Sequence, residues 1–297
     1  MGTLLYYKDL VEKENSFERV LIKTKSDFTD LFDSVLKGGS DSIWRGLTES
    51  KFKHYTSLQR FWIQNDLEKK DEEVEKFLKH LFKYAKHWNS SFFKKYFENY
   101  GVGYFTIISA LSILRHHGTP TPMLDWSRNP LVALFFGVSS VDSYQSSNEI
   151  DNYFSLYEMK SSYPYYSHDL KDKTYEFFKT QETQLREANK SYKDDPRFLD
   201  NYVQGYLNQE DSFFKNIKRY PISRIQDLPD DKFKYFINNN YNITNQEGLF
   251  IMNVHPDRPL EEVLFERPKN LAAKAGHSQS EIDDVLAKHK KSLISYD

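Results

Sequence analysis

The sequence has no cysteine, and its 297 residues include only 11 glycines and 10 prolines. The absence of cysteine excludes disulfides, thiolate nucleophiles and cysteine-ligated zinc or iron–sulfur sites. A chain of this length buries roughly three quarters of its unfolded surface, so it needs no covalent or metal staple to fold. Any chemistry must come from arginine, histidine, carboxylate, amide or hydroxyl side chains.

Strong charge of one sign and long apolar runs are also missing. The 41 Lys and Arg residues are balanced by 43 Asp and Glu residues, a net charge of −2. No overall positive field therefore attracts nucleic acid or an anionic membrane, although a local basic groove stays open. No stretch approaches the roughly 18 apolar residues of a membrane span, and the N-terminal residues lack the pattern of a secretory signal. We expect a soluble, cytoplasmic protein without a membrane partner, and nucleic acid is a disfavoured partner.

Aromatic residues are abundant by contrast. The chain has 21 Tyr, 23 Phe and 4 Trp, 16% of its residues, at a mean hydropathy of −0.72. Large rings of this kind are mostly buried, and the tyrosine hydroxyl can stay in contact with water. We therefore expect most of them to form the core. Trp44 and Trp126 are the exceptions to test, because each adjoins a candidate site residue.

Hydrophobic periodicity predicts an α+β fold. We expect strands over residues 18–24, 41–47, 154–160, 248–254 and 263–268, and helices over 26–37, 67–88, 104–114, 130–138, most of 170–219, and 278–293. The strands and helices mix without a regular βαβ alternation, which favours a mixed, mainly antiparallel sheet with several flanking amphipathic helices.

The densest polar passage runs from His116 to Ser140. Two prolines favour an extended entry, and Asn129 followed by Pro130 is typical of a helix N-cap and first turn. The helix that follows is apolar on all sides, so we expect it to be buried. Residues 125–128 would then lie on a tight strand-to-helix junction inside the protein.

Arg45 is predicted to lie in a strand, between Trp44 and Gly46. An arginine there needs a partner, because an unpaired buried charge is costly. One interpretation is a structural ion pair with Asp125, which we expect to be a buried carboxylate. The other is an anion clamp that grips a phosphate or carboxylate while Gly46 lets the ligand approach the backbone.

His116 and His117 are predicted at a helix C-terminus, where the helix dipole favours a protonated imidazole. They are either a capping pair or ligand-binding and acid–base residues. Gln246 and Glu247 precede a predicted strand and are either a simple turn or two polar groups at a strand entrance. We predict no metal site, and the P-loop, nucleophile-elbow and dinucleotide-binding glycine motifs are absent.

Four segments together resemble the FRG domain family: WRG at residues 44–46, SLQR at 57–60, HHGTPTPMLDWSRNPLVALFFGV from His116, and QEGLF at 246–250. The resemblance predicts an FRG domain over 18–254, an N-terminal extension over 1–17, and a C-terminal strand and helix over 255–297 packed on the same domain. His116, Asp125 and Trp126 match family positions. Four residues depart from the family pattern: Arg115, Pro122, Ser127 and Asn242 replace the family's Gln, Arg, Thr and Arg. The loss of arginine at positions 122 and 242 would weaken an anion site that used those side chains.

The chain is also similar, more weakly, to ADP-ribosyltransferases, in the order of a first-strand arginine, a strand that leads directly into an apolar helix, and a late Gln–Glu pair. This resemblance implies a related fold, NAD as ligand, and ADP-ribosyl transfer or NAD cleavage, in bacterial defence or toxicity. The implied catalytic residues are Arg45, Asp125, Gln246 and Glu247. The implied ligand-binding residues are Trp44, Gly46, Arg60, His116, His117, Trp126 and Ser127.

The resemblance also gives roles. Arg45 would bind the pyrophosphate or a ribose, Trp126 or a nearby Tyr would stack on nicotinamide, and Gln246 or Glu247 would bind ribose hydroxyls, with charge stabilisation at the cleaved glycosidic bond. The alternative is a noncatalytic ligand-binding or protein-interaction module in which Arg45, His116 and Asp125 form a buried structural network. The sequence leaves the protein acceptor of any transfer open.

Overall fold

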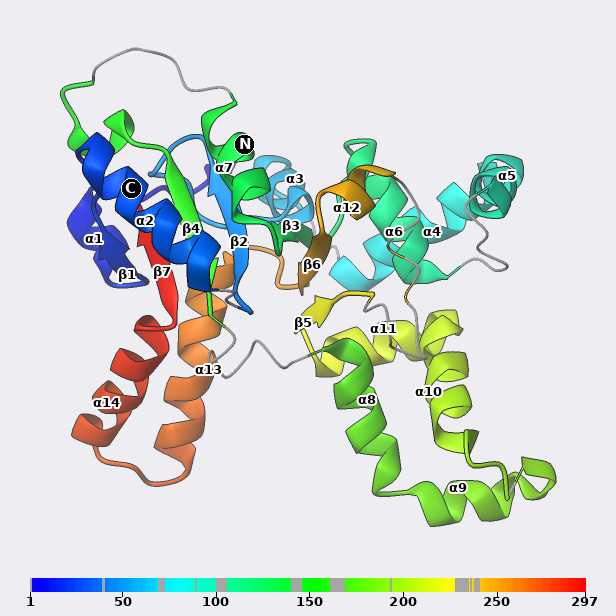
Figure 1. Cartoon of the computed structure of the whole chain (residues 1–297). Helices are drawn as coiled ribbons and strands as arrows, with labels where there is room; N and C mark the ends of the chain where they lie inside the picture. Colours follow the sequence, from blue (N-terminus) through cyan, green and yellow to red (C-terminus); the bar gives the residue numbers. More distant parts are fainter. Residues whose placement is uncertain are drawn as a thin grey trace.

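The computed structural model describes residues 2–38, 41–68, 73–88, 90–99, 106–139, 146–160, 169–192, 194–227, 235, 237 and 241–297. A seven-stranded sheet runs through the molecule in the order β1-β7-β4-β2-β3-β6-β5 (Figure 1). The strands are β1 Glu18–Val20, β2 Ile43–Leu47, β3 Met123–Ser127, β4 Ser155–Met159, β5 Ile222–Ile225, β6 Gly248–Asn253 and β7 Leu293–Tyr296. Only the β1–β7 pair is parallel among them, so the expected α+β class and mainly antiparallel sheet are confirmed.

The two central strands of the sheet, β2 and β3, are each well paired on their outer side but share very few backbone contacts with each other. β2 pairs with β4 over five residue pairs, and β3 pairs with β6 over five. Between β2 and β3 the paired register contains only Trp44 opposite Ser127. The two strands therefore part along the rest of their length, and this parting positions the site described below.

Helices surround the sheet (Figure 1). They are α1 Leu10–Glu14, α2 Lys25–Gly38, α3 Ser57–Gln64, α4 Val74–Trp88, α5 Ser90–Asn99, α6 Ile107–His116, α7 Pro130–Val138, α8 Leu170–Lys179, α9 Glu182–Ala188, α10 Phe198–Asn208, α11 Glu210–Arg219, α12 Tyr241–Asn245, α13 Leu260–Lys274 and α14 Gln279–Lys290, with 3-10 turns at Glu149–Asn152 and Lys190–Tyr192. No helix in the described ranges combines the length and the apolar character needed to cross a membrane.

The sheet is buried on both faces, because alternate residues of its strands enter two different cores. Met123 packs in a core shared with α3, α4, α6, α10 and α11, whereas its neighbour Leu124 packs in a core shared with α13. Aromatic residues such as Trp62 and Phe213 lie in the first core, and Phe17 lies in the second. Most of the large rings therefore form core, as the composition predicted.

The predicted strand over 263–268 is wrong. These residues belong to α13, which buries Leu260, Val263 and Leu264 on one side. Their spacing of i, i+3 and i+4 is helical, but the β-favouring side chains and the following proline masked it. The C-terminal strand is instead β7, which follows α14 and lies between β1 and β4.

The start of α7 is confirmed and its expected burial is wrong. Asn129 Oδ1 accepts a hydrogen bond from the Leu131 amide at 3.0 Å, and Pro130 is the first helical residue. Only Ala133 and Gly137 are buried in this helix, and Phe135 is 64% exposed. Leu131, Phe136 and Val138 are also exposed.

Gly46 lets α7 approach β2 very closely. A β-carbon at Gly46 would lie 1.9 Å from the Ala133 carbonyl oxygen and 2.5 Å from the Gly137 amide nitrogen. The helix backbone therefore rests directly on β2, and a narrow stripe of small residues makes the contact. The missing side chain of Gly46 thus makes room for α7. Its backbone also lines the pocket described below, so a ligand's approach to that backbone stays a prediction.

Candidate functional site

A pocket of about 540 Å³ opens where β2 and β3 part, and we call it the β2–β3 pocket. Its volume lies in the range of small-molecule sites. Its polar lining is Arg45, Thr48, Arg60, Arg115, His116, Asp125, Ser127, Asn242 and Gln246, and its remaining lining is Trp44, Gly46, Leu47, Phe52, Trp126, Val132, Ala133 and Phe136. The structure thus brings together every candidate site residue except His117 and Glu247.

Three arginines and a single carboxylate stand among the described residues that line this pocket. Arg115 donates from Nε and Nη2 to Asp125 Oδ2, at 3.1 and 2.6 Å. Arg45 donates from Nη1 to the main-chain carbonyl of Asp125. The expected Arg45–Asp125 ion pair is therefore wrong, and Arg115, which the sequence marked only as a departure from a family pattern, is the true partner.

Arg45 is a deeply placed cation. Burial lowers the pKa of Arg45 to about 10. The charge of Asp125 partly opposes this shift, and the charges of Arg115 and Arg60 add to it. Its Nε is buried and has no hydrogen-bond partner within the part of the chain that the structure describes. The group stays charged at neutral pH, so the pocket presents a concentrated positive charge within a chain of net charge −2.

The second arginine of the cluster, Arg60, comes from α3 and lies nearer to solvent. Partial burial lowers its pKa, and the neighbouring Arg115 lowers it further, while Asp125 acts in the opposite direction. The guanidinium groups therefore repel one another at short range. An incoming anion would relieve this repulsion.

The two tryptophans at the pocket are core residues that reach it with only part of their surface. Trp44 is 1% exposed and stacks on Tyr296, with ring centroids 6.1 Å apart. Trp126 is 3% exposed and stacks on His54, with centroids 5.9 Å apart and planes inclined by 15°. Its Nε1 is buried without a hydrogen-bond partner. One ring face of Trp126 is thus already occupied, and its stacking on nicotinamide stays a prediction.

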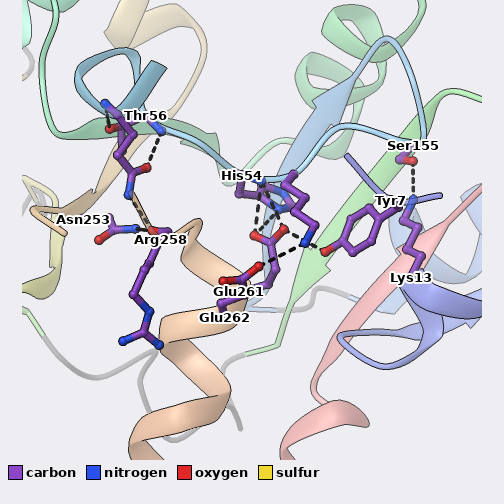
Figure 2. A network of polar contacts seen from close by, with 11 residues as sticks. Tyr7, Lys13, His54, Thr56, Ser155, Asn253, Arg258, Glu261 and Glu262 are labelled. Atoms are coloured by element: carbon purple, nitrogen blue, oxygen red, sulfur yellow. Dashed lines mark hydrogen bonds and ion pairs between the residues drawn. The ribbon is translucent and has the colours of Figure 1, made fainter. Parts of the chain in front are cut away.

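A buried polar network fixes His54 (Figure 2). The His54 ring is the one that stacks on Trp126. The Glu261 carboxylate of α13 accepts hydrogen bonds from the Tyr7 hydroxyl at 2.7 Å and from the His54 amide, and it lies 3.2 Å from His54 Nδ1. Burial lowers the pKa of His54. Burial also acts to raise the pKa of Glu261, but hydrogen bonds from His54 and Tyr7 bring the Glu261 pKa below its ordinary value. The His54 imidazole and the Glu261 carboxylate thus stabilise each other's position, an arrangement for which the sequence held no signal.

The turn before β6 brings Gln246 to the pocket. Ser127 Oγ donates to the Gln246 carbonyl at 2.6 Å and accepts from the Asn129 amide at 2.9 Å. The next residue, Glu247, is exposed and adopts a φ of 48°, typical of a turn. Ser127 therefore serves the junction itself, and of the late Gln–Glu pair only Gln246 lines the pocket.

Of the two candidate histidines, His116 and His117, only the first lines the pocket. His116, the last residue of α6, lines the pocket, and partial burial lowers its pKa; Asp125 opposes this shift and Arg115 adds to it. This direction is opposite to the one expected from the helix dipole. His117 is the C-cap of α6 through its backbone and lies outside the pocket lining.

Comparison with known families matches residues 40–146 to the family described as the FRG domain. The chain contains an FRG domain. The match includes β2, α3, α6, β3 and α7, which supply most of the pocket lining, whereas Asn242 and Gln246 come from outside the matched residues. The wider limits of 18–254 stay a prediction. No curated protein and no solved structure matches the chain.

Proposed function

We propose that the β2–β3 pocket of this FRG-domain protein binds a nucleotide-like anion, with NAD as the candidate ligand. The observation that carries the proposal is the convergence of Arg45, Arg60 and Arg115 on one pocket that holds one carboxylate. Guanidinium groups match phosphate oxygens in charge and hydrogen-bond geometry. Since Asp125 is bound to Arg115, the guanidinium of Arg45 keeps its charge for the ligand.

The apolar part of the pocket favours a nucleotide over a bare phosphate. Phe52 and Phe136 line it together with Leu47 and Val132, and Phe136 is 44% exposed. Exposed aromatic rings offer a surface on which a planar base can stack. A ligand with a diphosphate on the arginines and a ring on this wall would use both kinds of lining.

The proposed reaction is ADP-ribosyl transfer or NAD cleavage. The N-glycosidic bond to nicotinamide breaks, nicotinamide leaves as a neutral molecule, and C1′ forms a bond to water or to an acceptor nucleophile, which releases its proton. Arg45 would hold the pyrophosphate, and Asp125 and Gln246 would lie beside the sugar and stabilise its developing positive charge. Consumption of NAD harms the cell in which it occurs, and on this basis we extend the proposal to bacterial defence or toxicity.

A noncatalytic ligand-binding module is the second candidate, and the position of Glu247 favours it. Glu247 is exposed on the turn outside the pocket, and the pocket's carboxylate at Asp125 is held by Arg115. This arrangement can bind an anion while Asp125 stays in its ion pair with Arg115. The buried network of Arg45, His116 and Asp125 expected for such a module is not formed.

Two measurements test these proposals together. NAD and ADP should each raise the melting temperature of the wild-type protein and of Arg197→Ala, an exposed arginine at the start of α10, but not of Arg45→Ala. Release of free nicotinamide from NAD, lost in Arg45→Ala, supports catalysis; binding without release supports the noncatalytic module. Equal thermal shifts in wild type and Arg45→Ala, or none in wild type, would overturn the proposed site.

A further inference from the structure

We infer that Asp125 recognises the vicinal hydroxyls of a ribose, so that the β2–β3 pocket selects ribonucleotides over their deoxy counterparts. This inference rests on the proposed function and specifies its substrate class. It also moves the recognition of ribose away from Glu247, which lies outside the pocket. Among the described lining residues, Asp125 carries the only carboxylate.

Among the described residues, only one oxygen of this carboxylate has a hydrogen-bond partner. Both hydrogen bonds from Arg115 go to Oδ2, and the Asp125 side chain is 44% exposed. Each carboxylate oxygen has two lone-pair sites, so Oδ1 can accept from two hydroxyl groups at once. Hydrogen bonds to an ionised acceptor are also roughly twice as strong as neutral ones.

Asp125 is held in position before a ligand arrives. Its main-chain carbonyl accepts from Arg45, its side chain from Arg115, and its backbone pairs with Phe250 of β6. An acceptor fixed in this way needs little further ordering on binding, so more of its hydrogen-bond energy contributes to affinity and selectivity.

The surrounding charges place phosphate and sugar next to each other. Asp125 contacts two of the three pocket arginines, Arg45 through its backbone and Arg115 through its side chain. A phosphate bound by these guanidinium groups brings an attached ribose close to the same carboxylate. A free diol near an isolated carboxylate would lack this anchor, so the phosphate and the hydroxyls are recognised together.

The test measures the affinities of ADP, 2′-deoxy-ADP and inorganic pyrophosphate by titration calorimetry. Wild type should bind ADP at least about tenfold more tightly than 2′-deoxy-ADP, because one charged hydrogen bond is lost. Asp125→Asn should bring this ratio close to one and bind pyrophosphate more tightly, since a negative charge has been removed. Asp284→Asn, an exposed carboxylate on α14, should behave as wild type.

The outcomes separate the inference from the function on which it rests. If Asp125→Asn strengthens the binding of all three compounds by one factor and keeps the ADP preference, the role of Asp125 is electrostatic and the inference is overturned. Equal affinity of wild type for ADP and 2′-deoxy-ADP overturns it without any variant. If wild type binds none of the three compounds, the proposed function itself fails.

Discussion

Arg115 Nη2 lies 2.6 Å from Asp125 Oδ2, and this ion pair engages the one carboxylate among the described lining residues of the pocket that holds Arg45. Arg115 was not part of the anion clamp expected from the sequence. It nevertheless decides how much positive charge that clamp offers to a ligand. Arg45 touches Asp125 only at its carbonyl oxygen, which carries no net charge.

Replacement of Arg115 by Gln should weaken the binding of ADP by about tenfold, because a charged donor leaves the pocket and Asp125 turns toward the remaining arginines. The free energy of unfolding should fall by less than about 1 kcal/mol, since the pair is partly exposed. Calorimetric titration and urea unfolding measure the two effects. Arg186→Gln, which breaks a comparable 2.7 Å pair with Glu182 on α9, should leave ADP binding unchanged. An unaltered affinity in Arg115→Gln would contradict the prediction.

Gly46→Ala should destabilise the protein by about 2 kcal/mol or more, because the added methyl group meets backbone atoms of α7 that cannot move independently. A matched control is Gly205→Ala in α10, where a β-carbon meets nothing within 4 Å. That change should stabilise by about 0.5–1 kcal/mol, since alanine is the better helix former. Thermal unfolding of both variants gives the comparison. Similar melting temperatures for the two would show that α7 can retreat from β2.

The positions of the pocket motifs along the chain could be predicted, because each has a strong local signal. Arg45 was predicted in a short strand, Asp125 before an Asn–Pro helix start, and Gln246 just before a strand, and all three are observed there. Their meeting in one pocket followed only from the resemblance to a family. Local patterns do not specify that β2 and β3 touch at a single pair and then part.

The contacts within the site could not be predicted, because they depend on side chains that are distant in sequence. The sequence offered Arg45 as the cation for Asp125, and only the packing of the C-terminal end of α6 brings Arg115 to it instead. His54 has no motif around it and matters because Trp126 stacks on it. The exposure of Phe135 contradicts the usual meaning of an apolar helix, since α7 packs on Gly46 of β2 through Ala133 and Gly137.

Lys13→Met should cost about 3–5 kcal/mol, because it leaves a buried carboxylate without its cation. Lys13 is fully buried, and Nζ donates to Ser50, Ser155 and Asp297, the last at 2.5 Å. Burial lowers the pKa of this lysine to about 8, although Asp297 opposes the shift. Urea unfolding measures the loss, with Lys51→Met, which breaks partly exposed ion pairs, as a control expected to cost less than about 1 kcal/mol. Equal losses in the two variants would rule out a special cost for the buried pair.

Asp169→Asn should change how stability depends on pH. Burial raises the pKa of the Asp169 carboxyl to about 7, an effect that the Tyr235 hydrogen bond at 2.5 Å partly opposes. Between about pH 4 and pH 7 the folded protein therefore holds a proton that the unfolded chain releases, so the free energy of unfolding falls as pH rises through this window. Asparagine cannot titrate, and it can replace aspartate as the N-cap of α8, where Oδ1 accepts from the Lys171 amide at 2.9 Å.

Urea unfolding of wild type and Asp169→Asn at pH 4, 6 and 8 isolates this group, because all other titrations cancel in the difference between the two proteins. The variant should be more stable than wild type at pH 8 by an amount on the order of 1–4 kcal/mol, and the gap should close toward pH 4. Parallel pH profiles for the two proteins would mean that Asp169 titrates near its ordinary pKa despite its burial. A gap that widens toward acid would mean that the folded protein holds this carboxylate ionised, with Tyr235 and the helix start outweighing the cost of burial.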